Sequence, residues 1–185
     1  MDTAKADRAP GPLDLLRLLV NTLDYPTGPD ELGTPESATK WCRNHGLSSV
    51  STHADLERLH AFREAVRDLL YANNGEGDVN LAWERMRPFL ASSRFALRLV
   101  SHDAPALEAQ GAGIDRTIAT LLAIVYDAVA AGTWTRLRAC RKSNCRFAYY
   151  DQSKNGSRAW CSMALCGNRV KAQRRRSRDR HDVAR

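Results

Sequence analysis

The sequence has no long hydrophobic run. Its longest apolar stretch near the start, Leu13–Val20, is interrupted by Asp14 and Arg17, and charged residues precede it. A secretory signal needs an unbroken apolar segment, and a membrane helix needs about 20 mostly apolar residues in succession. The sequence therefore predicts neither, and we expect a cytoplasmic protein that has no membrane partner.

Motifs of common enzymes are also missing. The chain contains no nucleophile elbow, no phosphate-binding loop and no dinucleotide fingerprint. Hydrophobic residues make up 43% and charged residues 26% of the 185 residues, a balance that excludes a wholly disordered chain and a collagen-like fibre. We therefore expect a folded protein that is not an enzyme, with one ordinary domain and a small appended module.

Acidic residues almost disappear from the last part of the chain. Residues 134–185 contain 15 Lys and Arg against 3 Asp and Glu, whereas residues 1–133 contain 13 against 18. Such an excess of positive charge attracts polyanions, of which nucleic acid is the commonest in a cytoplasm. Because the change of character falls at Gly132–Trp134, we predict one domain over residues 1–133 and another over residues 134–185.

The first 133 residues have the pattern of a mostly helical domain. Apolar residues recur at helical spacing between turn residues, and Thr34 before Pro35 and Ser51-Thr52 are typical helix starts. These signals predict helices over residues 13–23, 35–41, 51–73, 80–90 and 114–131. Residues 95–100 alternate and suit an edge strand, so the expected fold class is mainly α with a possible small sheet.

Four of the five cysteines form two close pairs. Cys140 and Cys145 are separated by four residues, as are Cys161 and Cys166, and 15 residues separate the pairs. Two such pairs can surround one zinc ion with four thiolates, which leaves no position for a catalytic water. In a reducing compartment we favour one structural zinc over paired disulfides, and an iron–sulfur cluster is a more distant alternative.

The residues around the pairs predict a knuckle, a β-hairpin and a helix, an arrangement similar to a treble clef. Asn155-Gly156 is a favourable hairpin turn, and Ser162 can cap a helix that begins near Met163. Arginine side chains on this helix can bind phosphates or the edge of guanine, and a solvated basic helix without a partner is the alternative. The residues that we predict to contact nucleic acid are Arg158, Asn168, Arg169, Lys171, Arg174, Arg175, Arg176 and Arg178.

The module resembles the CGNR zinc-finger family, whose name is the sequence that stands here at Cys166-Gly167-Asn168-Arg169. The first part of the chain, with Leu19–Leu23 and Arg63–Arg67, resembles the ABATE domain that usually precedes this finger. The resemblance implies a bacterial, stress-induced transcription regulator that binds one zinc ion through Cys140, Cys145, Cys161 and Cys166 and contacts DNA.

Other candidate residues have weaker signals. Asn21 and Thr22 interrupt an apolar helix end. They either line a small-molecule pocket, or they cap the helix or tie down the following turn by hydrogen bonds to the backbone. Cys42 is isolated, and a buried unreactive thiol is the simpler interpretation.

We therefore expect a zinc-containing DNA-binding regulator whose first domain senses a signal or forms a homodimer. The alternatives are a zinc-dependent module that binds RNA or an acidic protein, and an enzyme with a pocket at Asn21 and Thr22.

Overall fold

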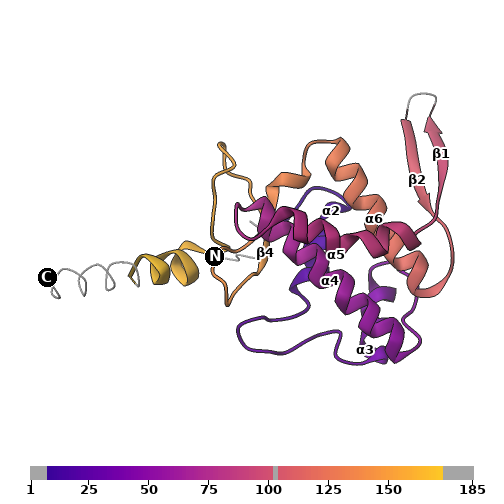
Figure 1. Cartoon of the computed structure of the whole chain (residues 1–185), viewed down its shortest axis with the longest axis horizontal. Coiled ribbons are helices and arrows are strands. Elements are labelled where there is room, and N and C mark those ends of the chain that lie inside the picture. The colour runs from indigo at the N-terminus through magenta and orange to yellow at the C-terminus, as the bar shows by residue number, and fades with distance from the viewer. Residues whose placement is uncertain (1–7, 102–103, 173–185) are drawn as a thin grey trace, which may run out of the picture.

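The computed structural model describes residues 8–101 and 104–172. A two-stranded hairpin protrudes at one end of the molecule, and the helix that follows the cysteines lies at the other (Figure 1). No helix in these ranges has the length and hydropathy of a membrane span.

The main helices are α2 (Leu13–Asn21), α3 (Pro35–Asn44), α4 (His53–Asn73), α5 (Val79–Ser92) and α6 (Gly113–Ala130). The strands are β1 (Phe95–Ser101), β2 (Ala104–Ala109), β3 (Leu137–Ala139) and β4 (Ala148–Tyr150). The predicted mainly α fold class is confirmed.

Helices α3 and α4 begin at the capping residues that the sequence indicates, Thr34 and Thr52. The Thr52 side chain accepts a hydrogen bond from the Asp55 backbone at 3.1 Å, and the Asp55 carboxylate accepts one from the Thr52 backbone at 3.0 Å. This reciprocal arrangement satisfies two backbone donors that a helix start leaves unpaired. Helix α4 ends before Gly75, whose φ of +75° disfavours other residues.

Helix α4 is the centre of the hydrophobic core. It packs against α2, α3, α5 and α6, and its residues Leu59, Phe62 and Leu70 are fully buried. The same core includes Leu137 and Ala139 of β3 and Ala148 and Tyr150 of β4. The hydrophobic core is therefore continuous across residue 133, and the two-domain division stays a prediction about folding units.

The predicted edge strand is present, and it has a partner that the sequence pattern did not indicate. Strands β1 and β2 pair antiparallel, with Phe95 opposite Ala109 and Leu97 opposite Leu107. Helix α6 packs against β2, which leaves β1 on the outer side of the hairpin (Figure 1).

A buried ion pair ties the loop after α2 to α4. The Arg63 guanidinium, whose side chain is 3% exposed, donates hydrogen bonds to both carboxylate oxygens of Asp30 at 2.8 Å. Burial alone would raise the pKa of Asp30, but the hydrogen bonds from Arg63 and from the Leu32 backbone outweigh it, so the pKa lies below its ordinary value of 3.8. The ionised form of Asp30 is therefore the form that the folded state prefers.

Replacing Asp30 by asparagine should lower the free energy of unfolding at pH 7 by about 2 kcal/mol, because a buried guanidinium loses its counter-charge. Since the folded-state pKa is lowered, this contribution is present above 3.8 and is lost as the pH falls through the folded-state value. Urea unfolding of wild type, Asp30→Asn and the exposed control Glu57→Gln at several pH values measures it. A wild-type advantage that stays constant as the pH falls below 3.8 would contradict this account of the ion pair.

Candidate metal centre

The first cysteine pair lies in the loop between β3 and β4. Leu137 pairs with Tyr150 and Ala139 with Ala148, and Cys140 extends the ladder by donating from its backbone to Phe147 at 3.0 Å. The Cys145 backbone donates to Lys142 at 2.8 Å, which closes a tight turn and returns the second thiol toward the first. We call residues 140–146 the knuckle.

The position of the predicted hairpin was wrong. We expected Asn155-Gly156 to join two strands after the knuckle, but the two strands flank the knuckle and residues 151–159 form a loop. The Asp151 carboxylate is fully buried and accepts hydrogen bonds from the backbones of Ser153 and Arg158, both at 2.9 Å. These bonds tie both ends of the loop to one buried carboxylate.

The second cysteine pair belongs to the start of a helix. Ser162 is the N-cap and accepts from the Leu165 backbone at 3.3 Å, which confirms the predicted cap. The first turns, Met163–Gly167, are a π-helix, and residues 168–172 continue as an α-helix. A Cβ atom on Gly167 would lie 2.6 Å from the Met163 sulfur and 3.1 Å from Trp160, so a larger residue here would displace the end of the Met163 side chain.

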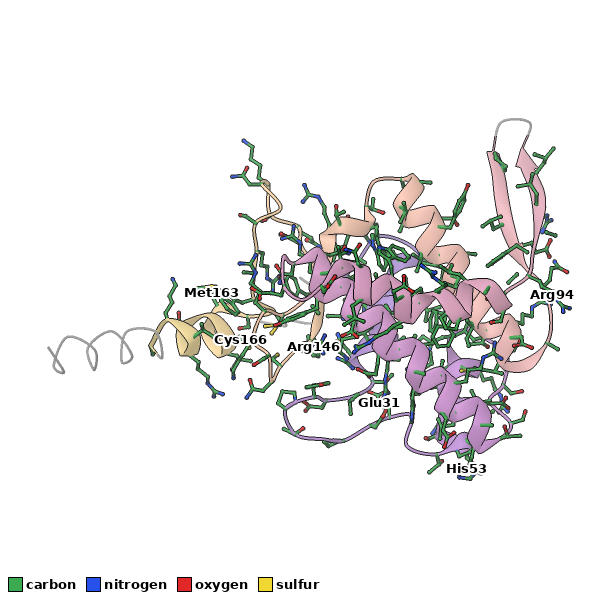
Figure 2. The ribbon with its side chains drawn as sticks, viewed as in Figure 1. Glu31, His53, Arg94, Arg146, Met163 and Cys166 are labelled. Atoms are coloured by element: carbon green, nitrogen blue, oxygen red, sulfur yellow. The ribbon has the colours of Figure 1, made fainter. Side chains whose placement is uncertain are left out.

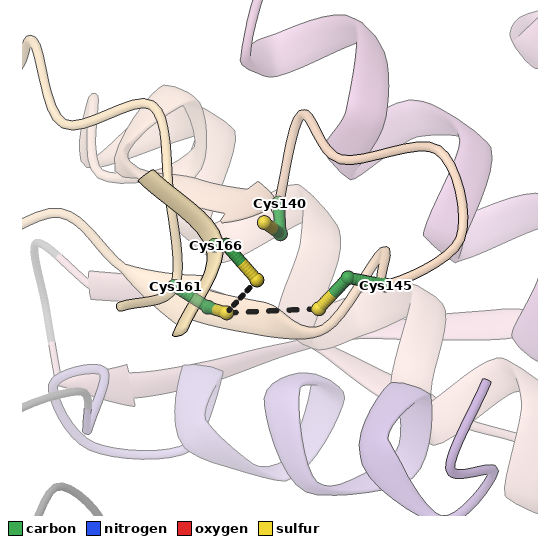
Figure 3. Close-up of side chains that lie close together, drawn as sticks. All are labelled: Cys140, Cys145, Cys161 and Cys166. Atoms are coloured by element: carbon green, nitrogen blue, oxygen red, sulfur yellow. Dashed lines mark hydrogen bonds between the residues drawn. The ribbon is translucent and has the colours of Figure 1, made fainter. Parts of the chain in front are cut away.

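The four sulfur atoms converge on one point (Figure 3). All lie within 4.8 Å of one another, and the Cys145–Cys161 and Cys161–Cys166 sulfur distances are 3.6 and 3.7 Å. A disulfide requires about 2.05 Å, whereas a tetrahedral zinc site with bonds of about 2.3 Å separates its sulfurs by about 3.8 Å. The donor set therefore fits one structural zinc ion, which Cys140, Cys145, Cys161 and Cys166 would hold.

The four thiols influence one another's protonation. The neighbouring Cys145 and Cys161 thiols stabilise the Cys140 thiolate and lower its pKa to about 2. The same interaction, together with burial, raises the pKa of Cys145 to about 12, and the pKa of Cys161 is raised as well. Several thiolates this close together would repel one another without a cation. Zinc supplies the positive charge that allows all four thiolates to coexist.

Arg158 makes contacts within the module. Its guanidinium lies over the Tyr149 ring, 4.6 Å from the centroid, and donates to the carbonyl oxygens of Trp160, at 2.8 Å, and of Cys161. The side chain therefore holds the segment that carries Cys161. A contact of Arg158 with nucleic acid stays a prediction.

The end of α4 is the main attachment of the module to the helices. The Asn73 side chain donates to the carbonyl oxygens of Trp134 and Leu137, both at 3.0 Å. The side-chain nitrogen of Asn74 lies 2.8 Å from the Ala139 oxygen, 3.0 Å from the Ala159 oxygen and 3.1 Å from the Tyr149 hydroxyl. The buried Asn74 amide thus contacts both the residue before Cys140 and the segment just before Cys161. Sequence reasoning assigned these asparagines only to the helix end.

A buried arginine makes a second attachment. Arg67 is fully buried and donates to the carbonyl oxygens of Val20, at 2.7 Å, and Arg146, at 3.2 Å. Arg146 follows Cys145 and has a φ of +48°, and Figure 2 shows it where the knuckle meets the helices. Its guanidinium lies 4.5 Å from the centre of the Tyr71 ring and pairs with Asp68 at 2.5 Å. These contacts determine how the knuckle sits on α4.

The remaining predicted nucleic-acid residues divide into two groups. Asn168, Arg169 and Lys171 are exposed on the helix that follows the second cysteine pair, whereas Val170 between them is half-buried. Arg174, Arg175, Arg176 and Arg178 lie outside the described residues. The described part of this helix therefore presents three of the predicted side chains to solvent.

Asn21 and Thr22 have structural contacts. The Asn21 side chain donates to the Ala148 carbonyl at 2.9 Å and accepts from the Ala148 backbone at 2.7 Å, so it pairs with β4 like a strand residue. The buried Thr22 hydroxyl donates to Leu19 at 2.7 Å and accepts from Arg63 at 3.0 Å. The bond from Thr22 to Leu19 is a helix-end hydrogen bond of the kind expected as the alternative to a pocket. Asn21 instead joins the helices to the module.

Comparison with known protein families agrees with this architecture. Residues 136–179 match the profile of the CGNR zinc finger, and residues 13–133 match the ABATE profile, described as "Putative stress-induced transcription regulator". No curated protein matches the chain. Because the ABATE match covers most of the sequence and the cysteines of the second match form a four-thiolate site, the chain belongs to the ABATE family and carries a CGNR zinc finger.

Proposed function

We propose that this protein is a transcription regulator that binds duplex DNA through its zinc module and the basic helix that follows it. The observation that carries the proposal is the placement of this helix. Its first turn includes the ligand Cys166, and its exposed Arg169 and Lys171 follow within five residues. A zinc-held helix start gives these side chains a defined direction, which phosphate and base contacts require.

Charge supports the same proposal. Residues 134–185 have a formal net charge of +12 against −5 for residues 1–133. Four thiolates and one zinc ion together carry −2, so this part of the chain remains strongly basic with metal bound. The helix also extends away from the helical core, where a duplex could approach it (Figure 1).

The knuckle supplies further groups on the same side of the module. A hollow of about 430 Å³ between the knuckle and the helix is bordered by Glu76, Arg141, Lys142, Ser143, Asn144, Trp160 and Val170. Glu76 pairs with Arg141 at 3.5 Å, so Lys142 is the cation of this hollow that we consider for DNA. Because Val170 belongs to the helix and Lys142 to the knuckle, a phosphate backbone lying against the helix would also reach the knuckle. We therefore include Lys142 among the proposed DNA contacts and leave out Arg158.

The affinity for DNA should fall steeply with salt. With about four phosphate contacts, counterion release predicts that Kd rises about 100-fold between 50 and 200 mM salt. Arg169→Ala and Lys171→Ala should each weaken binding, and a residue that contacts phosphate should also reduce the salt slope by about one. Fluorescence anisotropy with a DNA duplex measures this, and Arg87→Ala, which removes an exposed arginine from α5, is the matched control. Salt-independent binding, or an equal loss in the control, would contradict the proposal.

The second candidate function is recognition of RNA or of an acidic protein surface. Phe147 is exposed beside the knuckle, whereas Tyr149 and Tyr150 are buried and cannot stack on bases. The structure thus favours duplex binding over stacking on single strands. Competition of single-stranded RNA with the bound duplex distinguishes the two functions.

A further inference from the structure

The β1–β2 hairpin has one apolar face that continues beyond the core. In its register, Phe95, Leu97 and Leu99 of β1 share a face with Pro105, Leu107 and Ala109 of β2. Phe95 packs against the hydrophobic core, but Leu97 is 72% exposed and Leu99 is 69% exposed. An isolated two-stranded hairpin is only marginally stable in water, and a third strand over an apolar face stabilises it. The exposed part of this face is therefore the part that needs a partner.

The two edges of the hairpin differ. Arg94 accepts a backbone hydrogen bond from Gln110 at 2.9 Å, so the alternation of an antiparallel ladder turns the backbone groups of residues 95, 97 and 99 outward. On the other strand the outward positions are 105, 107 and 109. Pro105 has no N–H group there, and α6 packs against this strand. Proline thus interrupts the outer edge of β2, whereas residues 95, 97 and 99 leave the edge of β1 able to pair.

We propose that two copies of this chain pair through their β1 strands in an antiparallel four-stranded sheet. A two-fold axis at Leu97 places Leu97 opposite the partner's Leu97, and Phe95 opposite the partner's Leu99. All three residues then use their outward backbone groups, and the exposed leucines of both copies cover one another. The interface is the same patch on both subunits, as a two-fold dimer requires.

Charges on the other face agree with this register. Glu108 lies opposite Ala96 within the hairpin. In the proposed sheet, Ala96 in turn lies opposite the partner's Arg98. Glu108 of one copy and Arg98 of the other therefore lie on either side of the small Ala96. Their long side chains can meet above it, whereas identical charges never stand directly opposite each other.

The hairpin lies far from the zinc module. Figure 2 places Arg94, at the base of the hairpin, and Cys166 at opposite ends of the molecule. Pairing through β1 would therefore leave both basic helices accessible.

Cysteine substitutions test the register. Leu97→Cys places two thiols on a directly opposed pair with about 5.5 Å between Cα atoms, within disulfide range. Leu99→Cys places them four residues apart along the strands, or about 14 Å, which a disulfide cannot span. In a glutathione redox buffer, the zinc-loaded Leu97→Cys protein should become a covalent dimer and the equally exposed Leu99→Cys protein should not. Equal cross-linking of both variants would overturn the proposed register.

Sedimentation measures the association itself. Wild type should be dimeric at tens of micromolar, and Leu97→Lys should weaken dimerisation at least 100-fold. Leu81→Lys, which changes an exposed leucine of α5, should leave it unchanged. A monomeric wild type, or an equal effect of the Leu81 variant, would overturn the proposal. A monomeric protein would still contain the knuckle and the basic helix. Failure of the dimer proposal would therefore leave the DNA-binding proposal intact.

Discussion

Removing zinc should unfold the C-terminal module and lower the stability of the helices with it. A structural zinc ion in a small module contributes on the order of 10 kcal/mol to folding at neutral pH. The module has little core of its own, because the buried residues beside the cysteines are few, and Leu137, Ala148 and Tyr150 belong to the core around α4. Loss of the metal therefore exposes part of the shared core.

Thermal unfolding followed by circular dichroism measures this effect with and without a chelator. Cys166→Ala should reproduce the chelated state, with a lower Tm and altered fluorescence of Trp160. Cys42→Ala is the matched control, because Cys42 is fully buried outside the cluster. It should keep one zinc ion and lose only about 1 kcal/mol. A Tm that does not change on chelation would contradict a structural role for the metal.

Replacing Asn74 by alanine should lower the free energy of unfolding by about 3 kcal/mol and accelerate the loss of zinc. The substitution leaves the carbonyl oxygens of Ala139 and Ala159 and the Tyr149 hydroxyl without a donor from α4. Since Ala139 directly precedes Cys140 and Ala159 lies two residues before Cys161, both ligand pairs lose support.

Urea unfolding and the rate of zinc transfer to a coloured chelator measure the two effects. Asn80→Ala, which changes an exposed asparagine of α5, should alter stability by less than about 0.5 kcal/mol. Equal transfer rates in wild type and Asn74→Ala would show that α4 does not support the site.

Local signals in the sequence predicted the helices and the zinc ligands well. Thr34 and Thr52 cap helices because their side chains satisfy backbone groups only a few residues away. The cysteine ligands were predictable for a related reason: two close pairs already provide the donors that zinc prefers. Both signals are contained within short segments and do not depend on the rest of the fold.

Interactions between distant segments were not predictable in this way. Asn155-Gly156 has the composition of a hairpin turn, but the buried Asp151 carboxylate organises this loop instead. Asn74 has the composition of a helix end, and only the folded chain shows that its amide reaches Ala139 and Ala159. Arg67 stands in the motif that resembles the ABATE domain, and that motif was the only sequence signal for the attachment at Arg146.

X-ray absorption at the zinc edge, on protein purified without added metal, tests the central claim most directly. The four-cysteine site predicts one zinc ion per chain with four sulfur neighbours at about 2.3 Å and no oxygen or nitrogen neighbour. Less than one zinc per chain in protein that remains folded, or a spectrum that requires oxygen or nitrogen ligands, would contradict it.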